Sequence, residues 1–207
     1  MKRLALVLLL ALPAAAFGTV TIGGSVGPDG KTEVVCDLPV DQRTKNTAGK
    51  GGRGGLCVFT SIMHDARFQN VRDLFNFQNQ VRNDVSGGYP GNVDQEIRRY
   101  APNVQYVQYE GRDPSILALA LKTGRMPGVT WNGYHDPHYR GQKIAHMVSM
   151  VAYDQAANLV CLLDNNFIGD NQLVWMTPQD FLQGWTGGQS GWTVILLGPP
   201  PPPPPHN

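Results

Sequence analysis

The sequence carries little charge, and neither sign dominates. Lysine, arginine, aspartate and glutamate together make up 16% of the 207 residues, and the formal net charge is +1. No basic stripe of the kind that attracts nucleic acid or an anionic membrane surface is visible. We therefore expect no nucleic-acid partner. Internal repeats are also absent from the sequence, whereas glycine and proline are plentiful and indicate a loop-rich fold.

Long apolar runs are missing beyond the first residues, and no later stretch approaches the length of a membrane-spanning helix. At the start, the basic Lys2 and Arg3 precede an apolar run at 4–12, and small residues follow at 14–16. This three-part order is typical of a secretory signal peptide. We therefore expect residues 1–16 to be a signal peptide. The mature protein is then expected to be secreted or to lie in the periplasm or cell envelope, without stable membrane insertion.

About 190 residues follow the signal peptide, which is enough for one domain with a genuine core. Residues 17–46 read as an N-terminal extension and residues 47–198 as the main domain. The tail at 199–207 begins with seven prolines, which favour an extended polyproline II conformation and have no core to join. Nothing in the composition calls for an assembly, so we expect a monomer.

Cysteine is scarce, and the count is odd: Cys36, Cys57 and Cys161. In an exported protein this implies one disulfide and one free thiol, or three free thiols. Cys36 and Cys161 lie in strand-like runs, where they could pair or simply be buried. Cys57 is different, because it stands where the glycine-rich segment 47–55 gives way to a helical pattern.

The pattern of apolar residues separates helices from strands along the chain. Helices are expected from Leu56, over 71–81, from Asn92 to about Tyr100, over 114–124 and over 177–185. Strands are expected at 31–37, 104–109, 129–131, 144–152, 159–163, 172–176 and 191–197. Because most helices lead and most strands follow, the sequence predicts an α+β fold with an antiparallel sheet.

His146 is a polar exception near the start of the nearly apolar strand 144–152. A lone histidine in such a strand is most simply bonded to a backbone carbonyl. The next strand, however, ends in Asp164 and Asn165, and a hairpin at 153–158 would bring both back beside His146. An acid or an amide there can fix the tautomer and the orientation of an imidazole.

The expected proximity of His146 to Asp164 or Asn165 suggests a chemical role for Cys57. A thiol at a helix N-terminus lies at the positive end of the helix dipole, which favours the thiolate. The N–H groups of the first turn have no acceptor within the helix and can receive a developing oxyanion. The order Cys57, His146, Asp164 is therefore that of a thiol acyl-transfer enzyme.

We expect no catalytic role for the remaining histidines of the domain. His64 lies two helical turns beyond Cys57 on the same helix, so we expect it to point elsewhere rather than act as the base. His135 and His138 lie in a polar loop at 132–143, and with His146 they would allow a metal site. Their spacing fits no strong zinc signature, so we expect no metal.

At this point the chain resembles a known group, the papain-like cysteine peptidases. The resembling segments are "LCVFTS", "HMVSMVAYD", "LVCLLDN" and "WTVILL", and together they span about 47–197. The short interval between Cys57 and His146 is most similar to the branch of bacterial double-glycine leader peptidases. The resemblance implies a papain-like fold with N-terminal helices packed on an antiparallel sheet, a peptide or protein substrate, and no cofactor. It also implies that Cys57 is the nucleophile, His146 the general base and acid, and Asp164 the orienting residue, with Asn165 as the alternative.

The chain departs from the family in two respects: the cysteine lacks the Cys-Gly-x-Cys-Trp surround of papain, and an upstream glutamine is missing. The family usually has a glutamine six residues before the cysteine, which donates to the oxyanion hole, and here that position is Gly51. The nearest upstream amides are Gln42 and Asn46, and the glycine-rich loop could deliver one of them. The missing glutamine motivates one alternative, a catalytically reduced module that binds peptides or cell-envelope components. A second alternative is a transferase of the transglutaminase type, because such enzymes share the thiol, imidazole and acid groups.

Overall fold

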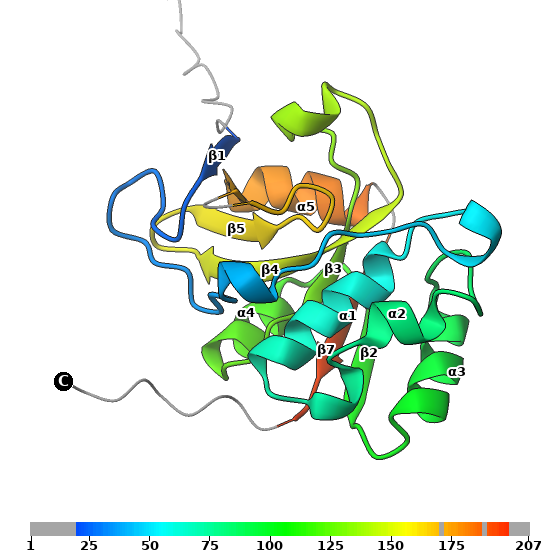
Figure 1. Cartoon of the computed structure of the whole chain (residues 1–207). Helices are drawn as coiled ribbons and strands as arrows, with labels where there is room; N and C mark the ends of the chain where they lie inside the picture. The colour runs from blue at the N-terminus through cyan, green and yellow to red at the C-terminus, as the bar shows by residue number, and fades with distance from the viewer. Residues whose placement is uncertain (1–19, 170–171, 188–189, 199–207) are drawn as a thin grey trace, which may run out of the picture.

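The computed structural model describes residues 20–169, 172–187 and 190–198. Its centre is an antiparallel sheet of seven strands in the order β1-β6-β5-β4-β3-β7-β2 (Figure 1). The strands are β1 (Thr21–Gly23), β2 (Tyr106–Gly111), β3 (Gly128–Trp131), β4 (His146–Asp154), β5 (Leu159–Leu163), β6 (Leu173–Met176) and β7 (Gly191–Leu196). The α+β architecture with an antiparallel sheet, expected from the sequence, is confirmed.

Helices cover both faces of this sheet. They are α1 (Cys57–Phe68), α2 (Phe77–Val81), α3 (Pro90–Tyr100), α4 (Ser115–Lys122) and α5 (Pro178–Thr186). Figure 1 shows α1 lying across the sheet, with α2 and α3 beside it. Short 3-10 turns occur at Val40–Gln42, Lys50–Gly52, Arg72–Leu74 and Pro137–Tyr139.

The central strand β4 separates two parts of the core. Met147 belongs to the cluster built by α1, α2 and α3, whereas Val148 and Met150 belong to the cluster that contains residues of α4 and α5. Successive side chains of a strand point to opposite faces, so β4 must be apolar on both. This explains why residues 147–152 form a nearly continuous apolar run rather than an alternating one.

Residues 20–46 differ from the expectation. No strand forms over 31–37; only an isolated bridge joins Val26 to Glu33. The amides of Val35 and Cys36 both donate to the carbonyl of Val151, at an irregularity in the β4–β5 pairing. The strand that does form, β1, lies earlier and pairs with β6 at the edge of the sheet.

Two helix boundaries also differ. The expected helix over 71–81 is split into a 3-10 turn and the short α2. Helix α3 begins at Pro90 rather than at Asn92, and the Asn92 side chain instead accepts a hydrogen bond from the Tyr89 amide at 2.8 Å. Proline suits the first turn of a helix because its missing N–H would have no partner there.

The two predictions for the chain ends, a signal peptide at 1–16 and a proline-rich tail at 199–207, concern residues outside the described ranges. Among the residues that are described, no helix is both long and apolar enough to cross a membrane.

Candidate active site

Cys57 is the first residue of α1. Glycines allow the chain segments around this helix start to pack closely together. A Cβ on Gly88 would lie 2.3 Å from the Cβ of Val58, and a Cβ on Gly54 would lie 1.7 Å from the Ser86 carbonyl oxygen. Gly54 also has a φ of +58°, which side-chain-bearing residues rarely adopt. The glycine-rich loop before α1 is thus fitted closely against the segment 86–88.

His146 opens β4, where it lies opposite Trp131 of β3. The antiparallel return of β5 ends at Leu163, so the next residue, Asp164, lies back beside the start of β4. The His146 Nε2–H donates to Asp164 Oδ1 at 2.7 Å, and both side chains are buried. The structure therefore brings these two candidate residues together.

The three candidate side chains act electrostatically as one unit. Burial by itself would raise the pKa of the Cys57 thiol, but its hydrogen bond and charge interaction with His146 lower it overall. Burial would lower the pKa of His146, but its hydrogen bonds to Asp164 and Cys57 raise it to about 9. Burial would raise the pKa of Asp164, but the hydrogen bond from His146 lowers it. All three directions favour a thiolate, an imidazolium and a carboxylate.

Asn165 was the alternative candidate for orienting His146, but its side chain bonds to other groups. Its Nδ2 donates to the Cys57 carbonyl at 3.1 Å, to Ser61 Oγ at 3.0 Å and to the Met147 carbonyl at 2.9 Å. The amide thus ties α1 to β4 beneath the thiol, and the contact to the imidazole ring comes from Asp164 instead.

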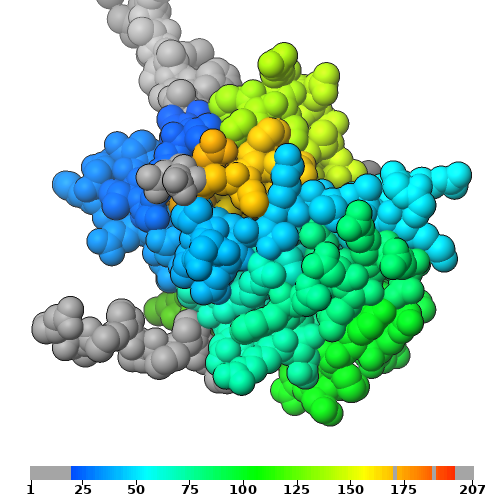
Figure 2. All heavy atoms as spheres, viewed as in Figure 1, coloured from blue at the N-terminus to red at the C-terminus, as the bar shows by residue number. Residues whose placement is uncertain are grey.

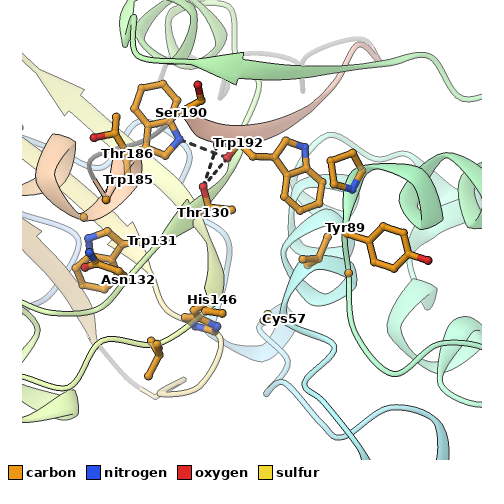
Figure 3. Close-up of a pocket in the computed structure, with 17 residues that line it drawn as sticks. Cys57, Tyr89, Thr130, Trp131, Asn132, His146, Trp185, Thr186, Ser190 and Trp192 are labelled. Atoms are coloured by element: carbon orange, nitrogen blue, oxygen red, sulfur yellow. Dashed lines mark hydrogen bonds between the residues drawn. The ribbon is translucent and has the colours of Figure 1, made fainter.

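A cleft of about 480 Å³ opens beside Cys57 and His146 (Figure 3). Its walls are mostly apolar, and three tryptophans contribute to them: Trp131, Trp185 and Trp192. The indole N–H of Trp185 donates to the main-chain carbonyl of Trp192 at 3.3 Å, and the indole N–H of Trp192 donates to Gln108 Oε1 at 2.9 Å. In Figure 3, Tyr89 lies on the side of the cleft opposite Trp131.

The other two cysteines are free and fully buried. Burial raises the pKa of the Cys36 thiol to about 12 and also raises that of Cys161. The structure therefore contains no Cys36–Cys161 disulfide, and of the three thiols only that of Cys57 has a lowered pKa.

The other histidines of the domain have separate partners. His64 Nε2 accepts a hydrogen bond from the Thr44 amide at 2.8 Å, and burial lowers its pKa to about 3, so it remains neutral. His135 Nε2 lies 3.1 Å from Gln183 Oε1, and His138 Nδ1 lies 2.9 Å from Asp136 Oδ1. Among the described residues, no group of three or more His, Cys, Asp or Glu side chains is arranged to hold a metal ion.

Of the two upstream amides, only Asn46 lies at the site. It lines a second pocket together with Cys57 and His146. Its Nδ2 lies 2.9 Å from the point where a Cβ of Gly55 would be, so the amide packs against the main chain two residues before Cys57. Gln42 is exposed, and Gly51 lies exposed on the loop with a φ of +66°.

Sequence reasoning did not identify Tyr139 and Asn166 as part of this site. The Tyr139 hydroxyl donates to Asp164 Oδ2 at 2.5 Å, and Asn166 Nδ2 donates to the Tyr139 oxygen at 2.9 Å. Tyr139 lies 25 residues before Asp164 in a polar loop. Because neither a period nor a motif joins the two positions, the only available signal was the presence of two tyrosines, Tyr134 and Tyr139, in a turn-rich stretch close to His146.

Comparison with known proteins bears on the fold. No protein-family model matches the chain. No curated protein matches it either. Among solved structures, the chain is similar to a protein from Bacillus anthracis described as a candidate C39-like peptidase, with 18% sequence identity and a TM-score of 0.52. The match covers 79% of this chain and 96% of that protein. The fold is therefore the papain-like α+β fold of C39-like peptidases.

Proposed function

We propose that this protein is an exported cysteine peptidase that hydrolyses peptide bonds through Cys57, His146 and Asp164. The observation that carries the proposal is the arrangement of these three residues at the edge of an apolar cleft, with a lowered thiol pKa and a raised imidazole pKa. The likeness to a candidate C39-like peptidase supports the same class of reaction. Export rests on the expected signal peptide alone.

The proposed reaction has two halves. In the first, the Cys57 thiolate attacks the peptide carbonyl carbon, and the His146 imidazolium then gives its proton to the departing amine. The product of this half is a thioester between Cys57 and the acyl part of the substrate. In the second half, His146 takes a proton from water, the resulting hydroxide attacks the thioester, and the carboxylic acid leaves as Cys57 is released. Asp164 orients the imidazole in both halves.

The oxyanion formed in each half needs donors near Cys57. The Cys57 main-chain N–H lies in the first turn of α1 and can supply one. We propose that Asn46 supplies the other, taking the role for which Gly51 has no side chain. One N–H of its amide donates to Asn166 Oδ1 at 3.1 Å, and the second can donate to an oxygen in the pocket that it shares with Cys57.

This assignment predicts a specific loss in the Asn46→Ala variant. We expect kcat to fall by about 10²-fold, because one oxyanion donor typically contributes that much, with little change in KM. The measurement is steady-state hydrolysis of a peptide that the wild type cleaves. Gln42→Ala is the matched control, because Gln42 is the other upstream amide and is exposed. Equal activities of the two variants would show that Asn46 is not the donor.

The alternative function is a papain-like module that binds peptides or cell-envelope components without turning them over. Gly51 motivates it, because the glutamine expected at that position is missing. The two functions differ in the state of the thiol. A binding module needs no thiolate at neutral pH, whereas a peptidase does. A transferase would share the thiolate and would differ in forming an isopeptide bond when an amine is added.

Iodoacetamide labelling tests the peptidase proposal directly. At pH 6 we expect one carbamidomethyl group per molecule, located on Cys57 by peptide mass mapping, because only the thiolate reacts. Cys36 and Cys161 serve as internal controls, since both are fully buried and their pKa values are raised. Labelling of Cys57 that begins only near pH 8.5, the range of an ordinary thiol, would favour the binding module.

A further inference from the structure

The carboxylate of Asp164 has more partners than its role beside His146 requires. Oδ1 accepts from His146 Nε2 at 2.7 Å and from the Asn166 amide at 2.8 Å. Oδ2 accepts from the Tyr139 hydroxyl at 2.5 Å. Asp164 is completely buried, so these donors replace the water that an exposed carboxylate would have.

Tyr139 can act only as a donor toward this carboxylate. Burial and the neighbouring charge of Asp164 raise the pKa of the Tyr139 phenol, so it remains protonated. Its single hydrogen goes to Asp164, and its oxygen accepts a hydrogen bond from Asn166 Nδ2 at 2.9 Å. Both functions of the hydroxyl are therefore satisfied, and its orientation is fixed.

The Tyr139 ring is held from several sides. A Cβ on Gly133 would lie 2.6 Å from Tyr139 Cδ2, so the ring packs directly on the backbone of its own loop. The ring also meets the edge of Phe167, with centroids 5.4 Å apart. Phe167 is itself stacked against the His138 ring, with ring centroids 4.1 Å apart. A ring enclosed in this way places its hydroxyl with little freedom of rotation.

We propose that Tyr139 is a positioning residue that acts through Asp164, a proposal that rests on the peptidase function proposed above. By holding Oδ2, the Tyr139 hydroxyl keeps the carboxylate plane turned so that Oδ1 faces His146. Tyr139 thus connects the polar loop 132–143 to the Cys57–His146 pair through Asp164.

A chain of hydrogen bonds extends this connection across the site. Asn46 Nδ2 donates to Asn166 Oδ1, Asn166 Nδ2 donates to Tyr139, and Tyr139 donates to Asp164. The amide proposed as an oxyanion donor and the acid that orients His146 are therefore linked through two intermediate side chains. The geometry of one end constrains the geometry of the other.

Tyr139→Phe tests the proposal because it keeps the ring and removes only the hydroxyl. The readout is the rate of Cys57 alkylation by iodoacetamide as a function of pH, which requires no peptide substrate. We expect the rise of this rate with pH to move upward by about one pH unit, because a hydrogen bond to a charged group is lost. The direction follows from positioning: without the Tyr139 hydroxyl the Asp164 carboxylate can turn away, so the imidazole that stabilises the thiolate is held less firmly.

The interpretation of the Tyr139→Phe shift requires that this substitution leave the other titratable groups near Asp164 unchanged. They are His146, the Cys57 thiolate beyond it, and Asp136, whose carboxylate is held by His138. Tyr134→Phe is the matched control, because Tyr134 is an exposed tyrosine on the same loop. We expect its alkylation profile to coincide with that of the wild type.

A second variant shows whether Tyr139 works through Asp164. In an Asp164→Ala background, Tyr139→Phe is expected to produce no further shift, since the acceptor is already gone. An equal shift in both backgrounds, or a Tyr139→Phe profile identical to that of the wild type, would overturn the proposal. Failure of the peptidase function would look different, because the wild type itself would then alkylate as an ordinary thiol.

With a cleavable peptide, Tyr139→Phe should lower kcat about tenfold and leave KM within about twofold of the wild type, as expected for the loss of one hydrogen bond to a charged group. A change confined to KM would assign Tyr139 to substrate binding and would contradict a positioning role.

Discussion

Replacing Cys57 with alanine is expected to abolish peptide hydrolysis, with a fall of about 10⁴-fold or more in kcat. The sulfur forms the bond to the substrate, and no other thiol can replace it. Cys36 and Cys161 are fully buried, and their raised pKa values keep them protonated. Because the substrate sequence is unknown, the measurement is the release of new amino termini from a mixed peptide library, quantified by mass spectrometry.

Cys57→Ser separates chemistry from shape in the same experiment. Serine keeps the size of the side chain, but its hydroxyl is far harder to ionise than a thiol, so His146 cannot hold it as an anion. We therefore expect Cys57→Ser to be as inactive as Cys57→Ala. Cys36→Ala is the control, because it removes a thiol from the core and leaves the cleft intact. Retained hydrolysis in Cys57→Ala, with Cys36→Ala also active, would contradict the assignment of the nucleophile.

The proximity of His146 and Asp164 could be predicted from the sequence because hairpin geometry is local. Two apolar strands joined by a short turn must return antiparallel, so the end of the second lies beside the start of the first. Residues 146 and 164 stand at those two positions. The same reasoning could not choose between Asp164 and Asn165, because successive residues just beyond a strand end point in different directions.

The position of Cys57 opposite this hairpin could not be derived from local pattern alone. Helix α1 and strand β4 are separated by more than 70 residues, and their contact depends on how the whole sheet assembles. The family resemblance supplied that contact. The helix start itself was readable, because the glycine-rich segment 47–55 ends where the apolar period of α1 begins.

The supporting residues were missed for the same reason. Asn46, Tyr139 and Asn166 meet only through long-range packing, and each is an ordinary polar or aromatic residue in a loop. The expected strand at 31–37 failed in a related way. Its β-branched residues favour a strand, yet its amides reach β4 only at the carbonyl of Val151, an irregular point of that strand. Strand propensity describes a preference, and the free edges of the sheet decide whether it is realised.

Two segments that contribute residues to the site project from the molecular surface (Figure 2). In Figure 2, the glycine-rich segment near residue 50 projects at the right of the view and the loop near residue 140 projects at the top. Asn46 lies just before the first segment and Tyr139 lies within the second, and both line the pocket that contains Cys57. We infer that the loops contribute both the walls of the site and the side chains that hold its polar groups.

The second large effect is expected for Asp164→Ala, with a fall in kcat/KM of about 10³-fold at pH 7. Asp164→Asn is the matched variant, since an amide oxygen can still accept from His146 Nε2 but carries no charge. We expect it to lose about tenfold, which is the difference between a charged and a neutral hydrogen bond. Equal losses in the two variants would mean that charge, rather than orientation, is the whole contribution of Asp164.

The pH profile gives the sign of the electrostatic contribution. In the wild type, activity rises as the Cys57 thiol ionises and falls as His146 loses its proton, at a pKa of about 9. Asp164 raises the pKa of His146, so its removal moves the alkaline limb downward, toward about 6.5 for an ordinary histidine. Loss of the imidazolium then raises the pKa of Cys57 toward about 8.5, which moves the acid limb upward. Because the two limbs move toward each other and cross, no pH remains at which thiolate and imidazolium are both abundant. Asp164→Ala should therefore lower the maximum of the profile as well as narrow it, whereas a profile of unchanged width would show that Asp164 does not set these pKa values.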